Sequence, residues 1–505
     1  MTRFSIILAM CISLSAEASP QMSGVVFPGL SQTEYVSIFS SLESQLKSDP
    51  SGSANELMRI IQDDTQASAH GAAFGLLAEA FRNMGLAYSA TVLYNKAFQL
   101  DMAINTKRIP NAIAQAEQVS RPSLLGQSFA DQYGNINSSQ SREAVAYEAA
   151  KFAQQNGNFA LANAMISIVP SEANQFGQIK NLEGIILANQ GNAEGAVVPL
   201  LISEQIALRD EDNELLNTAR INLARAYFAA GNFPRAVDYY SEVERTSAIW
   251  ADAHFEQAWA YFRMNDMNST LSMLHTHQSP FLESFYYPEA ELLRIYALFV
   301  MCKFPSAATE TDRFIDSNTP KRDKLDAFIQ NTPSNIFDQI RSDIELLTDN
   351  VPFLIRSRFL KDARLKKAFA AEDYATKELS KLSSMPQDAS VQIAMDSINA
   401  DLQQLKIDEG NRILSQAQFM AAELQQMLAD AEMHKLDILE MEAQMLRQAS
   451  ITGKMEDAKR VIQRNKRLKN NERTWPYQGE YWADELGYYR IKSKPECPAS
   501  MFQPK

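Results

Sequence analysis

Glycine, proline, cysteine and long apolar runs are all scarce in this chain of 505 residues. Only 18 glycines and 19 prolines occur, so few positions interrupt a helix, while Ala, Leu, Gln, Glu and Met are abundant. We therefore expect an all-α protein, long enough for two or three domains. Beyond the first residues, no segment is long and apolar enough to span a bilayer.

Positive charge is also in short supply, because the formal net charge is -13. Nucleic-acid binding depends on neutralising phosphates with Lys and Arg, so nucleic acid is excluded as the main partner.

Catalytic motifs are missing as well. The chain has five histidines but no His-Glu-x-x-His, no Gly-x-Ser-x-Gly and no phosphate-binding glycine loop. We interpret His275-Thr276-His277 as part of a loop, and Glu480, Asp484 and Glu485 as a polar face rather than a pair of catalytic carboxylates. The sequence thus predicts no catalytic residue, no metal ligand and no cofactor, and hence no enzyme.

The N-terminus is typical of a secretion signal. Arg3 precedes the apolar run 4–14, and Ala16-Glu17-Ala18 fits a cleavage site. We expect residues 1–18 to be removed and the protein to be secreted across the inner membrane, to the periplasm. A buried N-terminal helix and a lipid anchor on Cys11 are the alternatives.

Cleavage would leave two cysteines, Cys302 and Cys497. Two cysteines are too few for a disulfide framework. One bridge between them is possible in an oxidising compartment. We favour a buried thiol at Cys302 and a free thiol at Cys497.

A pattern with a period of about 34 residues occupies the middle of the chain. Its clearest copy is "NLARAYFAAGNFPRAVDYYSEV", in which small residues recur where two helices would cross and Gly231 lies at their turn. Further copies lie at 78–97, 150–166, 184–200 and 258–274, a degenerate copy at 295–307, and a poor match at 105–142.

This pattern resembles the tetratricopeptide repeat (TPR) family. The resemblance implies a right-handed superhelix of about six to seven helix pairs over residues 69–320, preceded by a helical lead-in at 19–68. Stacked pairs would share a continuous core. Members of the family bind other proteins, so the resemblance also implies protein partners.

In this family the first helix of each pair lines a concave groove, which would bind a partner peptide or helix. Several of the matching positions are aromatic, as suits a peptide site. Alternatively, the chain's own helices cover them. The candidate groove residues are Tyr147, Lys151, Asn181, Thr218, Arg225, Phe228, Phe255, Trp259, Phe262, Arg263, Leu292, Tyr296 and Phe299.

Longer helices are expected after the repeats, in a linker region at 321–389 that is broken at Pro333, Pro352 and Pro386. Residues 390–453 predict one long helix or coiled coil. From 413 to 445 its apolar positions alternate in steps of four and three, with His434 in one core slot. This seam could pair with a second chain, with the helices at 335–382 or with another protein.

The last segment, 454–505, combines a basic collar with an aromatic tail. Between 454 and 473 eight Lys or Arg face three acids, which fits an anionic surface, cell-wall polymer or simply a solvated helix end. The tail is too short to fold alone and must be buried against this chain or a partner. It is similar to tails of secreted bacterial TPR proteins, which implies docking. The candidate docking residues are Trp475, Tyr477, Tyr481, Trp482, Tyr488 and Tyr489.

Together these features favour a non-enzymatic interaction scaffold of the bacterial envelope. The alternatives are a protein that binds or processes cell-wall glycan through its aromatic tail, and a subunit of an outer-membrane assembly or motility machine.

Overall fold

The computed structural model describes residues 32–62, 70–283, 285–452, 461–464 and 477–497, with the backbone alone at 32–36, 448–452 and 461–464. Nearly all of this is helical, and its only strands form one antiparallel pair, so the all-α prediction is confirmed. The chain forms two compact units, each made of two stretches of sequence. Unit 1 contains residues 1–192 and 363–407, and unit 2 contains 193–362 and 408–505.

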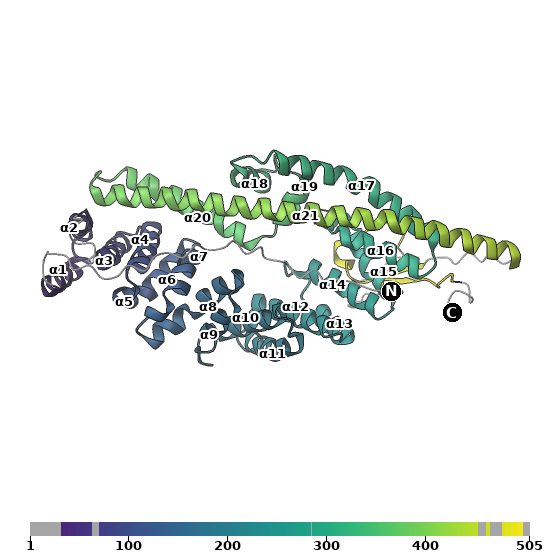
Figure 1. The fold of residues 1–505 in the computed structure, drawn as a ribbon, viewed down its shortest axis with the longest axis horizontal. Coiled ribbons are helices and arrows are strands. Elements are labelled where there is room, and N and C mark those ends of the chain that lie inside the picture. Colours follow the sequence, from purple (N-terminus) through teal and green to yellow (C-terminus); the bar gives the residue numbers. More distant parts are fainter. Residues whose placement is uncertain (1–31, 63–69, 284, 453–460, 465–476, 498–505) are drawn as a thin grey trace, which may run out of the picture. The chain divides into compact units, whose positions relative to one another are not determined.

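Unit 1 is built mainly from consecutive helices joined by short turns (Figure 1). Its helices are α1 (Gln32–Gln45), α2 (Pro50–Gln62), α3 (His70–Asn83), α4 (Ala87–Leu100), α5 (Met102–Asn105), α6 (Ile109–Gln118), α7 (Pro122–Asp131), α8 (Ser139–Gln155), α9 (Phe159–Ile166), α10 (Phe176–Asn189) and α20 (Ala363–Ser383), with the first part of α21 (Ala389–Thr452).

Unit 2 continues the helix pairs and ends with the small sheet. Its helices are α11 (Ala193–Arg209), α12 (Asn213–Ala229), α13 (Phe233–Ser241), α14 (Trp250–Arg263), α15 (Met267–His277), α16 (Pro288–Val300), α17 (Phe304–Gln330), α18 (Ile336–Glu345), α19 (Phe353–Phe359) and the rest of α21; its strands are β1 (Val461–Arg464) and β2 (Tyr489–Lys492).

A left-handed residue recurs at the repeat turns, as the period predicts. Gly157 and Gly191, and again Gly231 and Asn265, lie 34 positions apart and all have positive φ. Asn tolerates this conformation better than most residues, which explains how the weak copy at 258–274 still turns. Residues of positive φ at the turns inside the described helix pairs are Gly85, Ser120, Gly157, Gly191, Gly231, Asn265 and Cys302, and Glu211 has the same conformation between α11 and α12. The poorly matching stretch 105–142 therefore holds a helix pair, α6 and α7, with Ser120 at its turn.

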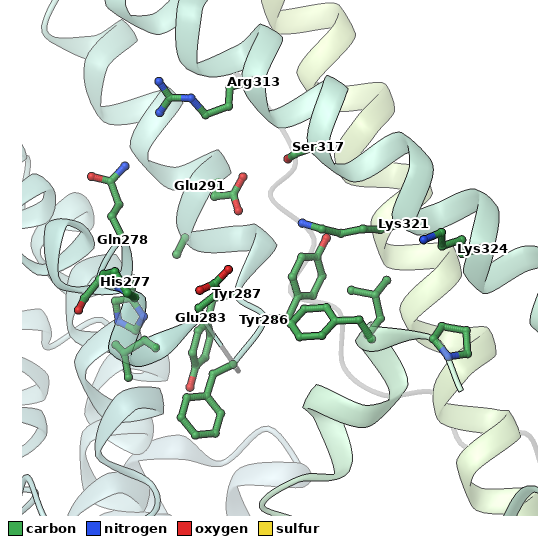
Figure 2. Close-up of a pocket in the computed structure, with 18 of the residues that line it drawn as sticks. His277, Gln278, Glu283, Tyr286, Tyr287, Glu291, Arg313, Ser317, Lys321 and Lys324 are labelled. Carbon is green, nitrogen blue, oxygen red and sulfur yellow. The ribbon is translucent and has the colours of Figure 1, made fainter. Parts of the chain in front are cut away.

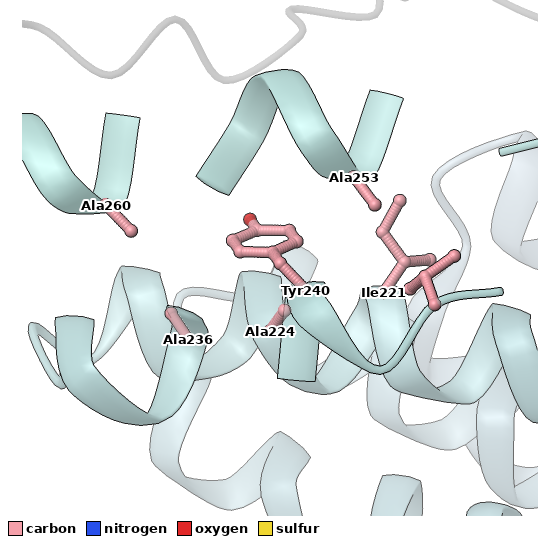
Figure 3. Packing of buried hydrophobic residues seen from close by; sticks show 7 residues of the cluster. Ile221, Ala224, Ala236, Tyr240, Ala253 and Ala260 are labelled. Atoms are coloured by element: carbon pink, nitrogen blue, oxygen red, sulfur yellow. The ribbon is translucent and has the colours of Figure 1, made fainter. Parts of the chain in front are cut away.

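The core of the clearest repeat is made of small residues around one tyrosine. Ala224 of α12 and Ala236 of α13 are fully buried where the two helices cross. Tyr240 points from α13 towards Ala253 and Ala260 of the next helix, α14 (Figure 3). Each pair thus buries its apolar face against the following pair, which is the packing expected of a helical repeat.

The first part of α21 is fastened to unit 1 by a buried ion pair. Asp401 lies 2.6 Å from Arg121 and also accepts a hydrogen bond of 2.6 Å from the Tyr88 hydroxyl. Glu378 of α20 accepts hydrogen bonds from the N–H groups of Tyr88 and Ser89, at the start of α4.

The predicted heptad seam of α21 faces the chain itself. The side chains of Ile413, Ala417, Leu424, Ala431 and Ile438 are all buried within unit 2. The ring of His434 packs edge-on against Tyr296 of α16, at 4.8 Å between centroids. Self-association through 413–445, which we predicted as a possibility, would therefore need another face of the helix.

Two expectations about helix ends and the tail need revision. Helices do end before Pro333, Pro352 and Pro386, but α17 runs straight through Pro320, where we expected the repeats to finish. The tail is not wholly irregular, because β1 and β2 pair with Val461 opposite Lys492 and Arg464 opposite Tyr489. The signal segment 1–18, Trp475 and most of the basic collar lie outside the described residues.

Candidate functional site on the first helices and the docked tail

The most open candidate groove residues lie on α12 and α14 of unit 2. Arg225 and Glu256 form two hydrogen bonds of 2.6 and 2.8 Å, and the Tyr240 hydroxyl donates to the same carboxylate. Burial alone would lower the pKa of Arg225, but the bonds to Glu256 outweigh it and raise that pKa. Trp259 and Phe262 lie further along α14, both half-buried, with their rings edge to face at 5.8 Å.

Other candidates in unit 2 are covered by the chain itself. Phe255 and Leu292 belong to the core, and Tyr296 is covered by His434 of α21. Phe299 packs on Phe304, the first residue of α17. For these positions the self-covered alternative is the one that the structure shows.

Phe228 and Arg263 both pack on Phe233, the first residue of α13, and the Arg263 guanidinium also lies 6.0 Å from the centroid of the Phe228 ring. The Phe228 ring packs edge-on against Phe233, just after the turn at Gly231, and the Arg263 guanidinium lies 4.6 Å from the Phe233 ring centroid.

The unit 1 candidates form a separate group. The Lys151 ammonium lies 5.7 Å from the centroid of the Tyr147 ring, both on α8, while Asn181 on α10 is buried. The structure thus brings Tyr147 together with Lys151 in unit 1, and Trp259 with Phe262 and Phe228 with Arg263 in unit 2.

The aromatic tail is docked on its own chain. Tyr477, Tyr481 and Tyr489 surround His275 on α15, with ring centroids 4.9–5.1 Å away. Tyr488 packs against the Arg245 guanidinium, which also donates to the carbonyls of Ala483 and Asp484. Of the described docking residues, Trp482 remains the most open, with 52% of its surface exposed. Between 477 and 497 the tail therefore packs on its own chain.

Three polar side chains along α15 hold the tail backbone. Thr276 accepts a hydrogen bond from the Gly487 N–H, Ser272 from the Ile491 N–H and Asn268 from the Ser493 N–H. These three residues follow one another at intervals of four, so they share one face of the helix. One edge of β2 thus bonds to helix side chains, and the other bonds to β1.

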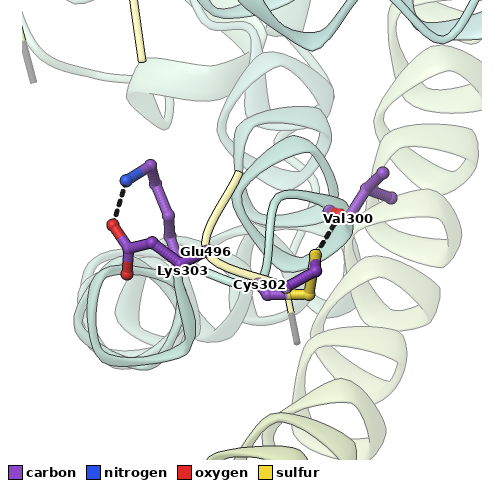
Figure 4. The surroundings of a disulfide bond; sticks show 5 residues. Val300, Cys302, Lys303 and Glu496 are labelled. Carbon is purple, nitrogen blue, oxygen red and sulfur yellow. Dashed lines mark hydrogen bonds and ion pairs between the residues drawn. A yellow bond between two sulfur atoms is a disulfide. The ribbon is translucent and has the colours of Figure 1, made fainter. Parts of the chain in front are cut away.

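A disulfide joins Cys302 to Cys497, so our preference for two free thiols was wrong (Figure 4). Cys302 occupies the turn between α16 and α17, and Lys303 beside it pairs with Glu496. The two cysteines are 195 positions apart in sequence, and only the docking of the tail on α15 and α16 brings them together. Nothing in the local sequence of either cysteine could indicate this pairing.

The histidines near α15 also differ from our expectation. His275 and His277 lie on the last turn of α15, not in a loop, and His254 of α14 stacks between Trp250 and His277. Burial, reinforced by Arg490 and Arg245, lowers the pKa of His254 to about 3. Two sequence patterns could have indicated this cluster of rings: the spacing of four between Trp250 and His254, and the pair His275 and His277.

The acidic residues of the tail lie in different surroundings. Glu485 is buried, and Glu480 accepts a hydrogen bond from the Gln478 N–H. Among the described residues, no group of His, Cys, Asp or Glu is arranged to hold a metal ion. Within the same ranges, every helix is too short or too polar to cross a lipid bilayer.

Comparisons with known proteins add little. No protein-family model and no curated protein matches the chain. The crystal structure of the APC/C hetero-tetramer Cut9–Hcn1 aligns with 79% of this chain and 85% of the other, at 13% identity and a TM-score of 0.24. These values are too low to support an argument about function. The class of the protein, a TPR-like helical repeat, rests on the helix pairs and left-handed turns described above, and this class suggests an interaction scaffold.

Proposed function

We propose that this protein is a non-enzymatic scaffold of the bacterial envelope that binds a peptide or helix of a partner protein on the first helices of its repeats. The observation that carries this proposal is the half-buried aromatic pair Trp259 and Phe262, on the same helix as Glu256 of the Arg225–Glu256 ion pair. Rigid aromatic side chains beside a fixed ion pair are typical of the centres of protein interfaces.

Secretion to the periplasm is part of the proposal. It is supported by the signal-like sequence at 1–18 and by the disulfide between Cys302 and Cys497, since such bonds persist in oxidising compartments. Expression of the full chain in a Gram-negative host, with fractionation and trapping of free thiols, tests it. We expect an oxidised protein in the periplasmic fraction that lacks residues 1–18.

Pull-down of partners from an envelope extract tests the groove. We expect Trp259→Ala to lower the affinity for the main protein partner by about 30-fold or more, as substitution of an interface hot spot does. Phe419→Ala is the matched control, because Phe419 is an exposed aromatic residue on α21 of the same unit. Retention of every partner by Trp259→Ala would refute the groove assignment.

A second candidate function is binding of cell-wall glycan, which the exposure of Trp482 favours. An indole that is half open to solvent on a fixed tail could stack on a sugar ring. Sedimentation of the protein with purified cell wall, lost in Trp482→Ala and kept in Trp259→Ala, would favour this function over the first.

A further inference from the structure

A large cavity lies in unit 2. The candidate groove residues do not line it, although Phe255 packs on two of its lining residues, His277 and Tyr287. The cavity measures about 1440 Å³ and is lined by the end of α15, residues 278–280, 282, 283 and 285–287, the start of α16, one face of α17 and residues 349–354. Cavities that hold small molecules measure about 300–1,000 Å³. This one has room for a segment of polymer.

The cavity lining is balanced in charge and rich in aromatic rings. Four Lys or Arg and four Asp or Glu side chains line it. Such a balance gives no reason to expect a phosphate, a nucleic acid or an anionic lipid, all of which require an excess of positive charge. The aromatic residues of the lining are Phe285, Tyr286, Tyr287, Phe328 and Phe353.

One acid and one ammonium of the lining lie on either side of a single amide, that of Asn318. Figure 2 shows Glu291 on α16 and Lys321 on α17, with their charged ends turned towards each other. They form no ion pair with each other in the described part of the chain. Burial raises the pKa of Glu291 and lowers the pKa of Lys321, so each charge is poorly solvated where it stands.

A buried amide fixes both groups in place. Asn318 accepts hydrogen bonds from the Lys321 ammonium at 3.2 Å and from the Tyr286 hydroxyl at 2.5 Å, and its amide nitrogen lies 3.5 Å from Glu291. The Lys321 ammonium also lies 4.8 Å from the centroid of the Tyr286 ring. Both groups are therefore ordered before any ligand arrives, which lowers the entropy cost of binding.

Of the other charged residues of the lining, Glu283 and Lys324 are exposed to solvent, and the rest have partners. Glu310 pairs with both Arg294 and Arg313, and Asp349 pairs with Arg356. Glu291 and Lys321 are thus the acceptor and the donor that remain oriented towards the cavity.

We propose that this cavity binds an extended peptide segment of a partner protein, with a backbone N–H donating to Glu291, a backbone C=O accepting from Lys321 and apolar side chains against the aromatic wall. A peptide backbone offers one donor and one acceptor per residue, which matches a fixed acid facing a fixed ammonium. The inference rests on the proposed function in assuming a protein partner, but it assigns a different binding place.

Selection of a phage-displayed random peptide library on the immobilised full chain tests this inference. Peptides that survive are measured by fluorescence anisotropy against the wild type, against Glu291→Gln and Lys321→Met, and against Ser317→Trp, which would fill the cavity. We expect losses of about tenfold or more for each cavity variant. Glu432→Gln, on the exposed surface of α21, is the control for a charge change, and circular dichroism melting checks that each variant folds.

The outcomes separate the two sites. Peptides that lose affinity only with the cavity variants support this inference and count against the groove. Peptides that respond only to Trp259→Ala support the groove and overturn this inference. A selection that enriches no peptide, or peptides that bind every variant equally, also overturns it.

Discussion

Single residues with left-handed backbone set the repeat turns. Gly231 and Asn265 occupy equivalent turns with φ of 79° and 62°. A side chain placed at Gly231 would meet nothing within 4 Å, so the demand for glycine there comes from backbone conformation and not from space. For a residue with a Cβ, this conformation costs roughly 1–2 kcal/mol, and less for Asn.

We predict opposite effects of substitution at these two turns. Gly231→Ala should lower the free energy of unfolding by about 1 kcal/mol, whereas Asn265→Gly should leave it unchanged or raise it slightly. Thermal unfolding followed by calorimetry measures both. The control is Gly134→Ala, since Gly134 has equally open surroundings but no positive φ. An equal loss at Gly134 and Gly231 would contradict the argument.

Burial lowers the pKa of both His254 and its stacking partner His277, and this predicts a pH dependence of unit 2. The ordinary pKa of 6.5 applies to His254 in the unfolded chain, and the folded value is about 3. Between about pH 3 and pH 6.5 the unfolded state binds more protons at His254 than the folded state does. The stability that depends on neutral His254 is therefore fully present above pH 6.5 and is lost as the pH falls.

From pH 6.5 to pH 5 this one group should remove roughly 2 kcal/mol from the free energy of unfolding. His254→Phe keeps a ring between Trp250 and His277 but cannot titrate. Its free energy of unfolding should therefore fall less between the two pH values than that of the wild type, by about the contribution of His254. Urea unfolding at both pH values, followed by tryptophan fluorescence, measures the difference. Equal losses in the two proteins would show that His254 is not the group responsible.

At the scale of elements, the tail is attached by β2, by the polar face of α15 and by one disulfide. A disulfide stabilises mainly by restricting the unfolded chain, by about 2–5 kcal/mol for a long loop. The loop closed by Cys302 and Cys497 spans 195 positions. The stability of the docked tail should therefore depend strongly on this disulfide.

We predict that Cys497→Ser lowers the melting temperature and speeds proteolytic cleavage of the tail between 477 and 497. Dithiothreitol should have the same effects on the wild type and none on the variant. Mass spectrometry of limited digests locates the cuts. A tail that resists protease equally in both redox states would show that the hydrogen bonds from α15 are sufficient alone.

Elements made by local sequence could be predicted, while contacts between distant segments could not. The turn glycines and the small residues Ala224 and Ala236 act on their own neighbours, so the helix pairs could be found. Ser120 and Cys302 adopt the same turn without the expected residue, because the packing of the flanking helices imposes it. The exposure of the candidate groove residues was only partly predictable, because contacts with α21, which is distant in sequence, decide whether a residue such as Tyr296 is covered.

At the scale of the whole molecule, α21 is the one described helix that belongs to both units. Its residues 389–407 lie in unit 1, and its residues from 408 onwards lie in unit 2. Asp401 forms its ion pair with Arg121 inside unit 1, whereas Ile438 is fully buried inside unit 2. One helix therefore completes two separate cores, and its heptad pattern reflects contacts within the chain.

We predict that substitutions in α21 act on one unit at a time. Asp401→Asn leaves Arg121 as a buried, poorly compensated charge and should cost about 3–5 kcal/mol in unit 1. Ile438→Ala leaves a cavity and should cost about 2–5 kcal/mol in unit 2. Hydrogen exchange with mass spectrometry, resolved along the chain, should show lost protection in α4 and α7 for the first and in α16 and α17 for the second. Loss of protection in both units from either substitution would mean that the units unfold as one, because α21 would then transmit the disturbance along its whole length.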